Sequence, residues 1–269
     1  MAFIVAMVMS AFGKRIIAEE IFLDSLPQAF EGFRILFITD IHRRRLPQAL
    51  LTSLKGPVDA VFLGGDMTEK NNPLNRLLSN MALVTSIAPT YAVHGNHDYN
   101  ANTSVVDNII RGSGAVLLMD ENVAIERAGA LLWLTGVNFS MNRGETSYPP
   151  LPPLAAVANA CRIILVHDPL WLSQRSSVPA DLILAGHTHG GQVVLPFFGQ
   201  RHVDAFYQEY SAGWFTLPKG DESQAFAKLL ISRGFGTARL PLRFRSPAEI
   251  HVLTLRTNSS TQKGEFQSQ

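Results

Sequence analysis

Five short apolar segments, each followed directly by a polar motif, constrain the fold of this chain more than any other feature of its sequence. Each segment has the length and composition of a buried β-strand. Open α/β sheets place their functional groups at the carboxyl ends of the strands, so we expect the polar motifs to meet at one end of a sheet. The five segments are Arg34–Thr39, Ala60–Leu63, Thr90–Val93, Arg162–Val166 and Asp181–Ala185.

The motifs after these segments carry carboxylate, amide and imidazole groups. A tight turn or a loop ion pair would explain any one of them, whereas all five in this order favour a metal site. Oxygen donors combined with imidazole nitrogens suit two divalent ions that activate water against a phosphorus centre. The motifs are Asp40-Ile41-His42, Gly64-Gly65-Asp66, Gly95-Asn96-His97-Asp98, Val166-His167-Asp168 and Gly186-His187-Thr188-His189-Gly190-Gly191.

The segments between and after these strands predict a mixed α/β fold. Helix-like stretches alternate with the first strands, which is typical of βαβ units. From Val116 onward, short apolar runs separated by turn residues indicate antiparallel strands, so mixed sheets are expected. The predicted helices are Pro47–Lys55, Pro73–Ile87 and Thr103–Gly112, and the predicted later strands are Val116–Leu118, Val123–Glu126, Leu131–Thr135, Gly191–Leu195, Ala227–Ser232 and Glu249–Leu255.

Composition excludes several classes of protein. The chain has 269 residues and 46% hydrophobic residues, enough for one large α/β unit. Its 23 basic and 22 acidic residues nearly cancel, which argues against a nucleic-acid partner because such proteins carry a basic surplus. Cys161 is the single cysteine, so neither an intrachain disulfide nor a thiolate metal cluster can form.

The N-terminal segment Met1–Phe12 is almost wholly apolar and is followed by Lys14 and Arg15. It falls short of the roughly 20 apolar residues that cross a bilayer, and a secretory signal would carry its positive charges before the apolar stretch. Three alternatives stay open: a buried first strand, a shallow membrane-contacting segment, or the remnant of a longer anchor. If the segment touches a membrane, the two basic residues favour a cytoplasmic location for the folded part; otherwise a cytoplasmic protein is expected.

The five motifs resemble those of the calcineurin-like metallophosphoesterase superfamily, whose pattern is D-x-H, G-D, G-N-H-[DE], H and G-H-x-H. The resemblance covers about Arg34 to His189. Other segments are similar to the bacterial YkuE- and YaeI-like phosphodiesterases, many of which are membrane-associated. The resemblance implies a four-layer α/β/β/α sandwich of two mixed β-sheets, the metallo-dependent phosphatase fold. The segments that carry the second similarity are Gly186–Gln192, Ser232–Gly236, Pro241–Arg243 and Pro247–Ile250.

The resemblance also implies a role for each motif residue. The first motif and the second histidine of the last motif would hold one metal ion. The asparagine of the third motif, the histidine of the fourth motif and the first histidine of the last motif would hold the second ion. The carboxylate of the second motif would bridge the two ions. The implied ligands are Asp40, His42 and His189 for the first ion, Asn96, His167 and His187 for the second, and Asp66 as the bridge.

His97 is the catalytic residue that the resemblance implies. The corresponding histidine of the family binds no metal, and either protonates the leaving oxygen or stabilises the transition state. Asp98 could orient the His97 ring by accepting a hydrogen bond, or it could cap the following helix.

Basic and aromatic residues outside the motifs are candidates for substrate contacts. Arg43 and Arg44 follow a predicted metal ligand directly and, with Arg45, could bind a substrate phosphate or anionic lipid headgroups, or simply form a solvated face. We interpret His94 as buried or lying behind the metal ligands, His202 as part of an irregular stretch with substrate contact as the alternative, and His251 as structural. The aromatic residues after the last motif form either a second core or an apolar wall for substrate; they include Phe197, Phe198, Phe206, Tyr207, Tyr210, Trp214 and Phe215.

We therefore expect a binuclear-metal-dependent phosphoesterase, specifically a phosphodiesterase. The alternatives are a lipid pyrophosphatase of the UDP-2,3-diacylglucosamine hydrolase type and a non-catalytic scaffold at a membrane or cell wall. Mn²⁺ is the expected metal, with Fe and Zn²⁺ as alternatives. The expected substrate is a phosphodiester or a pyrophosphate, with a lipid-linked form as a variant, and no protein partner is indicated. The expected units are residues 1–33 as an apolar lead-in, 34–256 as the catalytic domain and 257–269 as a polar tail.

Overall fold

A computed structural model of the chain describes residues 2–139, 148–154, 160–194, 204–220 and 225–258. The first of its two sheets has the strand order β1-β12-β2-β3-β4-β5. Strands β2 to β5 are parallel to one another, β12 is antiparallel to β2, and β1 is parallel to β12. The strands are β1 (Arg15–Leu23), β2 (Arg34–Ile38), β3 (Ala60–Leu63), β4 (Thr90–Ala92), β5 (Val116–Leu117) and β12 (Glu249–Thr257).

The second sheet has the order β10-β11-β9-β8-β7-β6. Its central strands β11, β9, β8 and β7 are parallel, and the two edge strands, β10 and β6, are antiparallel to their neighbours. Both sheets are therefore mixed, as predicted. The strands are β6 (Glu121–Arg127), β7 (Ala130–Val137), β8 (Arg162–Val166), β9 (Leu182–Ala185), β10 (Gly213–Pro218) and β11 (Phe226–Ile231).

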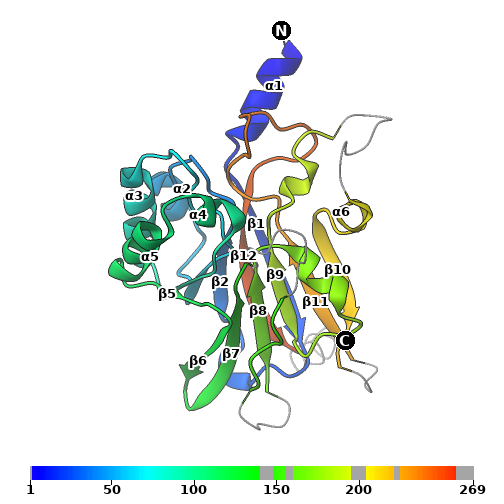
Figure 1. Cartoon of the computed structure of the whole chain (residues 1–269). Coiled ribbons are helices and arrows are strands. Elements are labelled where there is room, and N and C mark those ends of the chain that lie inside the picture. The colour runs from blue at the N-terminus through cyan, green and yellow to red at the C-terminus, as the bar shows by residue number, and fades with distance from the viewer. Residues whose placement is uncertain (1, 140–147, 155–159, 195–203, 221–224, 259–269) are drawn as a thin grey trace, which may run out of the picture.

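The two sheets pack face to face, and helices cover their outer faces (Figure 1). Alternate residues of β2 explain why its apolar run is continuous: Phe37 faces the other sheet, whereas Leu36 faces the helices. The same alternation in β8 places Leu165 between the sheets and Ile164 on the outer face. The helices are α1 (Ala2–Ala11), α2 (Gln48–Thr52), α3 (Leu74–Thr85), α4 (Asn96–Asn100), α5 (Thr103–Gly112) and α6 (Ala205–Glu209), with short 3₁₀ turns η1 (Gln28–Phe30), η2 (Pro169–Gln174) and η3 (His189–Gly191).

The structure corrects three details of the predicted strands. β5 pairs in parallel with β4, and β7 pairs in parallel with β8, although antiparallel pairing was expected for this part of the chain. Of the predicted strand Gly191–Leu195, the described residues contribute a single isolated bridge at Val193. Two strands that the sequence did not indicate, β1 and β10, each lie at the edge of a sheet.

The N-terminal segment is a helix rather than a buried strand. α1 projects from the body of the molecule (Figure 1). Met7 and Ala11 are buried against the loop that precedes β12, whereas Ile4 and Met9 are 59% and 71% exposed. Among the described residues, helices long and apolar enough to cross a bilayer are absent.

Candidate metal centre

The predicted ligands follow the carboxyl ends of β2, β3, β4, β8 and β9, and the fold brings these ends together. The backbone turns sharply as each strand ends, and five of the seven positions have a left-handed backbone. Such conformations are unfavourable for residues other than glycine and concentrate at functional sites. The five are Asp40 (φ 54°), His42 (φ 51°), Asp66 (φ 52°), His187 (φ 70°) and His189 (φ 50°).

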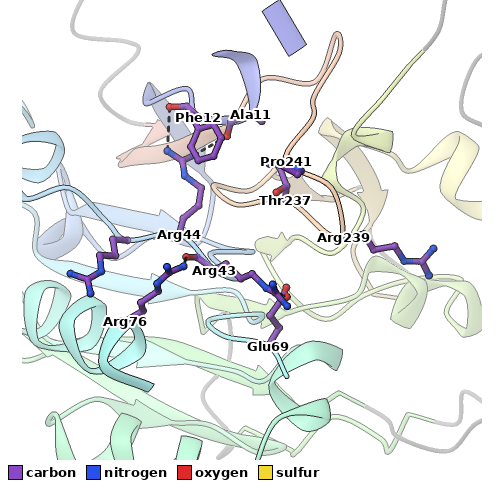
Figure 2. Close-up of a pocket in the computed structure, with 10 residues that line it drawn as sticks. Ala11, Phe12, Arg43, Arg44, Glu69, Arg76, Thr237, Arg239 and Pro241 are labelled. Atoms are coloured by element: carbon purple, nitrogen blue, oxygen red, sulfur yellow. Dashed lines mark hydrogen bonds and ion pairs between the residues drawn. The ribbon is translucent and has the colours of Figure 1, made fainter. Parts of the chain in front are cut away.

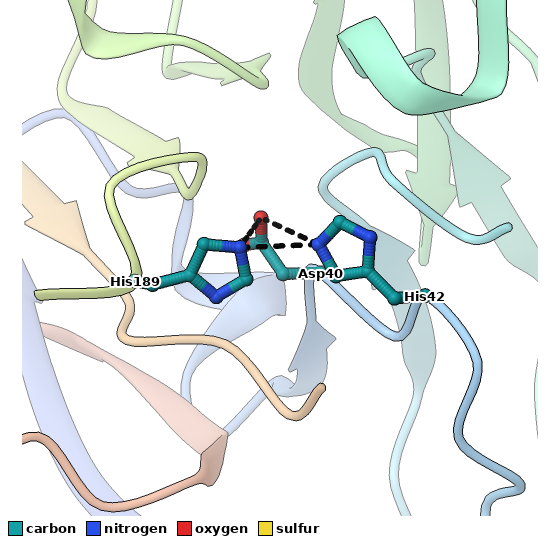
Figure 3. Close-up of side chains that lie close together, drawn as sticks. All are labelled: Asp40, His42 and His189. Carbon is teal, nitrogen blue, oxygen red and sulfur yellow. Dashed lines mark hydrogen bonds and ion pairs between the residues drawn. The ribbon is translucent and has the colours of Figure 1, made fainter. Parts of the chain in front are cut away.

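Asp40, His42 and His189 form one cluster (Figure 3). The Nε2 atoms of the two histidines lie 3.1 Å apart, and Asp40 Oδ1 lies 3.5 Å from His189 Nε2 and 3.9 Å from His42 Nε2. Asp40 Oδ2 accepts hydrogen bonds from the Thr39 hydroxyl and the His187 backbone N–H, but buried Oδ1 accepts none from the residues that the structure describes. The carboxylate oxygen and the two imidazole nitrogens therefore converge on one point. Such a buried set of ligand atoms fits a divalent cation.

Asn96, His167 and His187 form the second cluster. Asn96 Oδ1 lies 2.9 Å from His187 Nδ1 and 3.3 Å from His167 Nε2, and these two nitrogens are 3.2 Å apart. His167 Nδ1 lies 2.8 Å from the carbonyl oxygen of Gly64, to which it can donate. A proton held on Nδ1 leaves Nε2 free to bind a metal ion.

Asp66 lies between the two clusters. Its Oδ2 is 3.6 Å from His42 Nε2 and 3.4 Å from His167 Nε2, while Oδ1 accepts a 2.7 Å hydrogen bond from the His97 backbone N–H. Burial disfavours the carboxylate form, but His167 and His42 hold the pKa of Asp66 well below its ordinary value. Asp66 is therefore ionised and fixed where one of its oxygens can face both clusters.

His97 lies in the first turn of helix α4, beside this cluster. Its ring packs edge-on against the ring of His42, with centroids 4.8 Å apart. Burial and the nearby His42 lower the pKa of His97, although Asp66 acts in the opposite direction. Asp98 accepts hydrogen bonds from the backbone N–H groups of Gly95 (2.9 Å) and Thr68 (3.0 Å), which favours the capping alternative for this residue.

Side chains outside the predicted ligand set lie next to the outer nitrogens of three histidines. Glu69 Oε2 is 3.1 Å from His42 Nδ1, and Arg243 Nη2 is 3.2 Å from His189 Nδ1. Asp168 Oδ2 is 3.7 Å from His187 Nε2, and the Tyr207 hydroxyl donates to this carboxylate at 2.9 Å. A carboxylate such as Glu69 can accept the ring N–H and so fix ring orientation and tune ligand basicity, whereas the Arg243 guanidinium can only donate a hydrogen bond.

Arg243 is fully buried and links the metal centre to the chain before β12. Its guanidinium donates to the carbonyl oxygens of Gly234 and Ser246 at 3.1 and 3.0 Å. Burial lowers its pKa to about 10, so the side chain remains charged at neutral pH. The sequence singled out Arg243 only as part of the segment Pro241–Arg243, because its contact with His189 joins residues that are far apart in the chain.

The two arginines predicted to contact substrate lie differently. The Arg43 side chain is 60% exposed and pairs with Glu69. Arg44 donates to the carbonyl oxygens of Ala11 and Gly13 at 3.2 and 3.1 Å, at the carboxyl end of α1. Its guanidinium is thus directed at α1, whereas that of Arg43 borders solvent beside the metal centre.

The remaining candidates lie away from the metal ligands or outside the described residues. His94 Nε2 is 2.8 Å from Asp107 Oδ1, and His251 lies between two glutamates. Phe206, Tyr210 and Phe215 pack against the outer core of the second sheet, in agreement with a second core. Phe197, Phe198 and His202 lie outside the described residues.

Comparisons with known proteins agree with this geometry. Residues 33–212 match the calcineurin-like phosphoesterase family. The chain is 31% identical to the uncharacterized protein YpbG of Bacillus subtilis over 82% of this chain and 80% of that protein. It is 29% identical to the phosphodiesterase YaeI of Escherichia coli over 67% of this chain and 69% of that protein.

A solved structure shares the fold. The 5'-nucleotidase precursor of Thermus thermophilus superposes with a TM-score of 0.50 at 11% identity, over 83% of this chain. The chain spans 55% of the length of that protein. With the fold, the ligand motifs and the family match in agreement, the chain belongs to the calcineurin-like phosphoesterases.

Proposed function

We propose that this protein is a phosphodiesterase that depends on two divalent metal ions. The observation that supports it best is the position of Asp66 Oδ2, within 3.6 Å of an imidazole nitrogen from each cluster. A carboxylate at this point is suited to bridge two cations, as two-metal hydrolytic sites require. The similarity to a phosphodiesterase of Escherichia coli supports a diester rather than a monoester substrate.

The roles of the side chains follow from their positions. Asp40, His42 and His189 would hold one ion, and the Asn96 cluster would hold the other, with Mn²⁺ as the proposed metal and Fe or Zn²⁺ as alternatives. When bound, the two ions would supply an activated water and neutralise charge at the phosphorus centre.

His97 acts on the substrate side of this centre. Burial lowers the pKa of His97 and so favours the neutral ring, which can still donate an N–H hydrogen bond to a phosphate oxygen. His97 would either protonate the leaving oxygen or stabilise charge in the transition state. Arg43 is the arginine proposed to contact the substrate phosphate, because its side chain is exposed beside Glu69 and His42.

Hydrolysis of bis-p-nitrophenyl phosphate tests this function. The purified protein should hydrolyse this diester with Mn²⁺ and lose activity after chelation, and it should hydrolyse p-nitrophenyl phosphate less efficiently. His97→Ala should retain both metal ions but lower kcat by about 10²–10⁴-fold. Lack of turnover with Mn²⁺, Fe or Zn²⁺ would favour the scaffold alternative, and loss of metal from His97→Ala would make His97 a ligand.

We also propose that α1 makes peripheral contact with a membrane, with the catalytic domain on the cytoplasmic side. Exposed apolar side chains such as Ile4 and Met9 support the contact, and Lys14 and Arg15 support the orientation. A lipid-linked pyrophosphate is therefore the second candidate substrate. Release of product from such a lipid, measured beside the soluble diester, would distinguish the two.

A further inference from the structure

A pocket of about 500 Å³ lies between the carboxyl end of α1 and the metal centre. Arginines dominate its lining, and Glu69 is the one carboxylate among the described residues that line it (Figure 2). Phe12 and Pro241 form an apolar part of the wall. The pocket therefore combines positive charge with an apolar surface, which is the chemistry that recognises an anionic amphiphile.

The arginines divide into two groups by what they contact. Arg44 is held by carbonyl oxygens at the end of α1, and Arg43 pairs with Glu69. Arg76 donates a 2.7 Å hydrogen bond to the carbonyl oxygen of Arg43 and so steadies this turn. Arg45 and Arg239 are exposed at the rim of the pocket. The exposed arginines Arg45 and Arg239 can therefore offer positive charge to an incoming phosphate, while Arg44 and Arg76, which donate to carbonyl oxygens, keep the pocket in shape.

Helix α1 stands beside this pocket and exposes apolar side chains. Phe3, Ile4 and Val5 are all more than half exposed, and Phe12, at the pocket itself, is 52% exposed. The helix is nevertheless fixed to the body, because the Arg243 backbone N–H donates to the Met7 carbonyl oxygen at 3.1 Å. A fixed apolar projection beside clustered arginines provides the two signals that stable membrane binding requires.

The topology places this surface at the same end of the molecule as the metal centre. β1 begins at Arg15, shortly after α1, and is parallel to β12, which is antiparallel to β2. The start of β1 therefore lies near the end of β2, where the ligands Asp40 and His42 follow. Glu69 connects the two regions, since it lines the pocket and lies 3.1 Å from His42 Nδ1.

We infer that this pocket binds the headgroup phosphate of an anionic phospholipid while α1 enters the outer part of the bilayer. The metal centre then faces the membrane surface, where a lipid-linked phosphoester would be presented. This inference rests on the proposed membrane contact of α1 and adds to it a lipid class and a binding pocket. It does not depend on whether the metal centre hydrolyses diesters.

Sedimentation with vesicles tests the inference on the full chain. We compare vesicles of phosphatidylcholine alone with vesicles that also contain phosphatidylglycerol. Wild-type protein should prefer the anionic vesicles, and the double variant Arg45→Glu/Arg239→Glu should lose that preference. Each basic residue near an anionic surface contributes about fivefold in affinity, so the loss should be at least about 25-fold.

Two further variants separate charge in the pocket from general effects. Lys55→Glu/Arg111→Glu makes the same change in net charge at exposed sites that precede β3 and β5, at the opposite end of the first sheet, and should keep the preference. Ile4→Asn/Met9→Asn should weaken binding to both kinds of vesicle. Equal binding of wild-type protein to the two vesicle types would overturn the inference, and so would a full preference in the pocket variant.

Inorganic phosphate distinguishes a lipid from a free anion. If inorganic phosphate binds the wild-type protein but not the pocket variant in isothermal titration calorimetry, while the wild-type protein shows no preference for anionic vesicles, the pocket is a site for soluble phosphate and the inference is wrong. Diester hydrolysis is measured separately on the wild-type protein. An inactive protein that still prefers anionic vesicles would contradict the proposed function and leave the headgroup site supported.

Discussion

At the scale of single residues, the glycines of the motifs make room for the ligands that surround them. A Cβ atom on Gly95 would lie 2.2 Å from Asp66 Oδ1, and one on Gly186 would lie 2.5 Å from Asp40 Oδ2. A Cβ atom on Gly65 would meet the ring of His167 at 2.6 Å in the same way. The glycines therefore set the positions of ligands in neighbouring motifs, so that the motifs depend on one another.

Gly95→Ala tests this dependence. Its backbone has φ of −103°, which alanine adopts readily, so the substitution acts through contact with Asp66 and not through backbone strain. Displacement of Asp66 should raise the Kd for Mn²⁺ by about 10–100-fold, as for other changes that misplace ligands. The measurement is isothermal titration calorimetry. Gly112→Ala, where a Cβ would meet nothing within 4 Å, is the matched control and should leave the Kd unchanged.

At the same scale, local motifs indicated the seven candidate ligands that the fold brings together, but not the residues behind them. Asp-x-His and Gly-His-x-His are motifs of neighbouring residues, so the sequence alone suffices to propose Asp40 or His189 as a metal ligand. Arg243 reaches His189 across 54 positions of the chain, and such a contact exists only once the fold has formed. Glu69 lies three residues after Asp66 in a loop, and this spacing does not indicate where the Glu69 side chain points.

At the scale of elements, strand prediction succeeded where both faces of a strand are buried. β2, β3, β8 and β9 are continuous apolar runs because one face packs on the other sheet and one on the outer layer. β1 was not predicted because it is an edge strand that carries the partly exposed acidic residues Glu19 and Glu20. It pairs with β12, more than two hundred positions away, and local patterns do not indicate such a partner.

His251 connects β12 to β1 through ion pairs with buried and half-buried carboxylates. Its Nδ1 lies 3.4 Å from Glu19 Oε2, and its Nε2 lies 3.4 Å from Glu249 Oε1. Burial disfavours the imidazolium, but these two glutamates raise the pKa of His251 above its ordinary value. The same contacts lower the pKa values of Glu19 and Glu249.

These shifts predict how His251→Gln changes stability with pH. The imidazolium contributes fully below the unfolded pKa of about 6.5, and its contribution is lost as pH rises through the higher pKa of the folded state. The carboxylates contribute above about pH 4.5. Urea unfolding should therefore show a deficit of about 1–3 kcal/mol for the variant near pH 5.5, shrinking at alkaline pH. A deficit that stays constant between about pH 5.5 and 9 would show that the charge of His251 contributes nothing.

At the scale of the whole molecule, the metal centre joins the two sheets. Asp40, His42, Asp66 and Asn96 follow strands of the first sheet, whereas His167, His187 and His189 follow strands of the second. Between the sheets the contacts are apolar, but at this end the opposing groups are carboxylates and imidazoles. Cations bound here would cross-link the two halves of the fold. They would also give a partner to Asp40 Oδ1, which has none within the described part of the chain.

Metal binding should consequently stabilise the entire fold. A ligand that binds only the native state, at about 100 times its Kd, adds about 2.7 kcal/mol per site to the free energy of unfolding. We expect Mn²⁺ to raise Tm by several degrees in differential scanning calorimetry and chelation to reverse the rise. Asp66→Asn should abolish most of the rise in Tm, because the side chain that faces both clusters loses its charge. Glu126→Gln removes an exposed carboxylate of β6 and should retain the rise. An equal rise in Asp66→Asn would place the cations elsewhere and contradict the bridging position on which the proposed function depends.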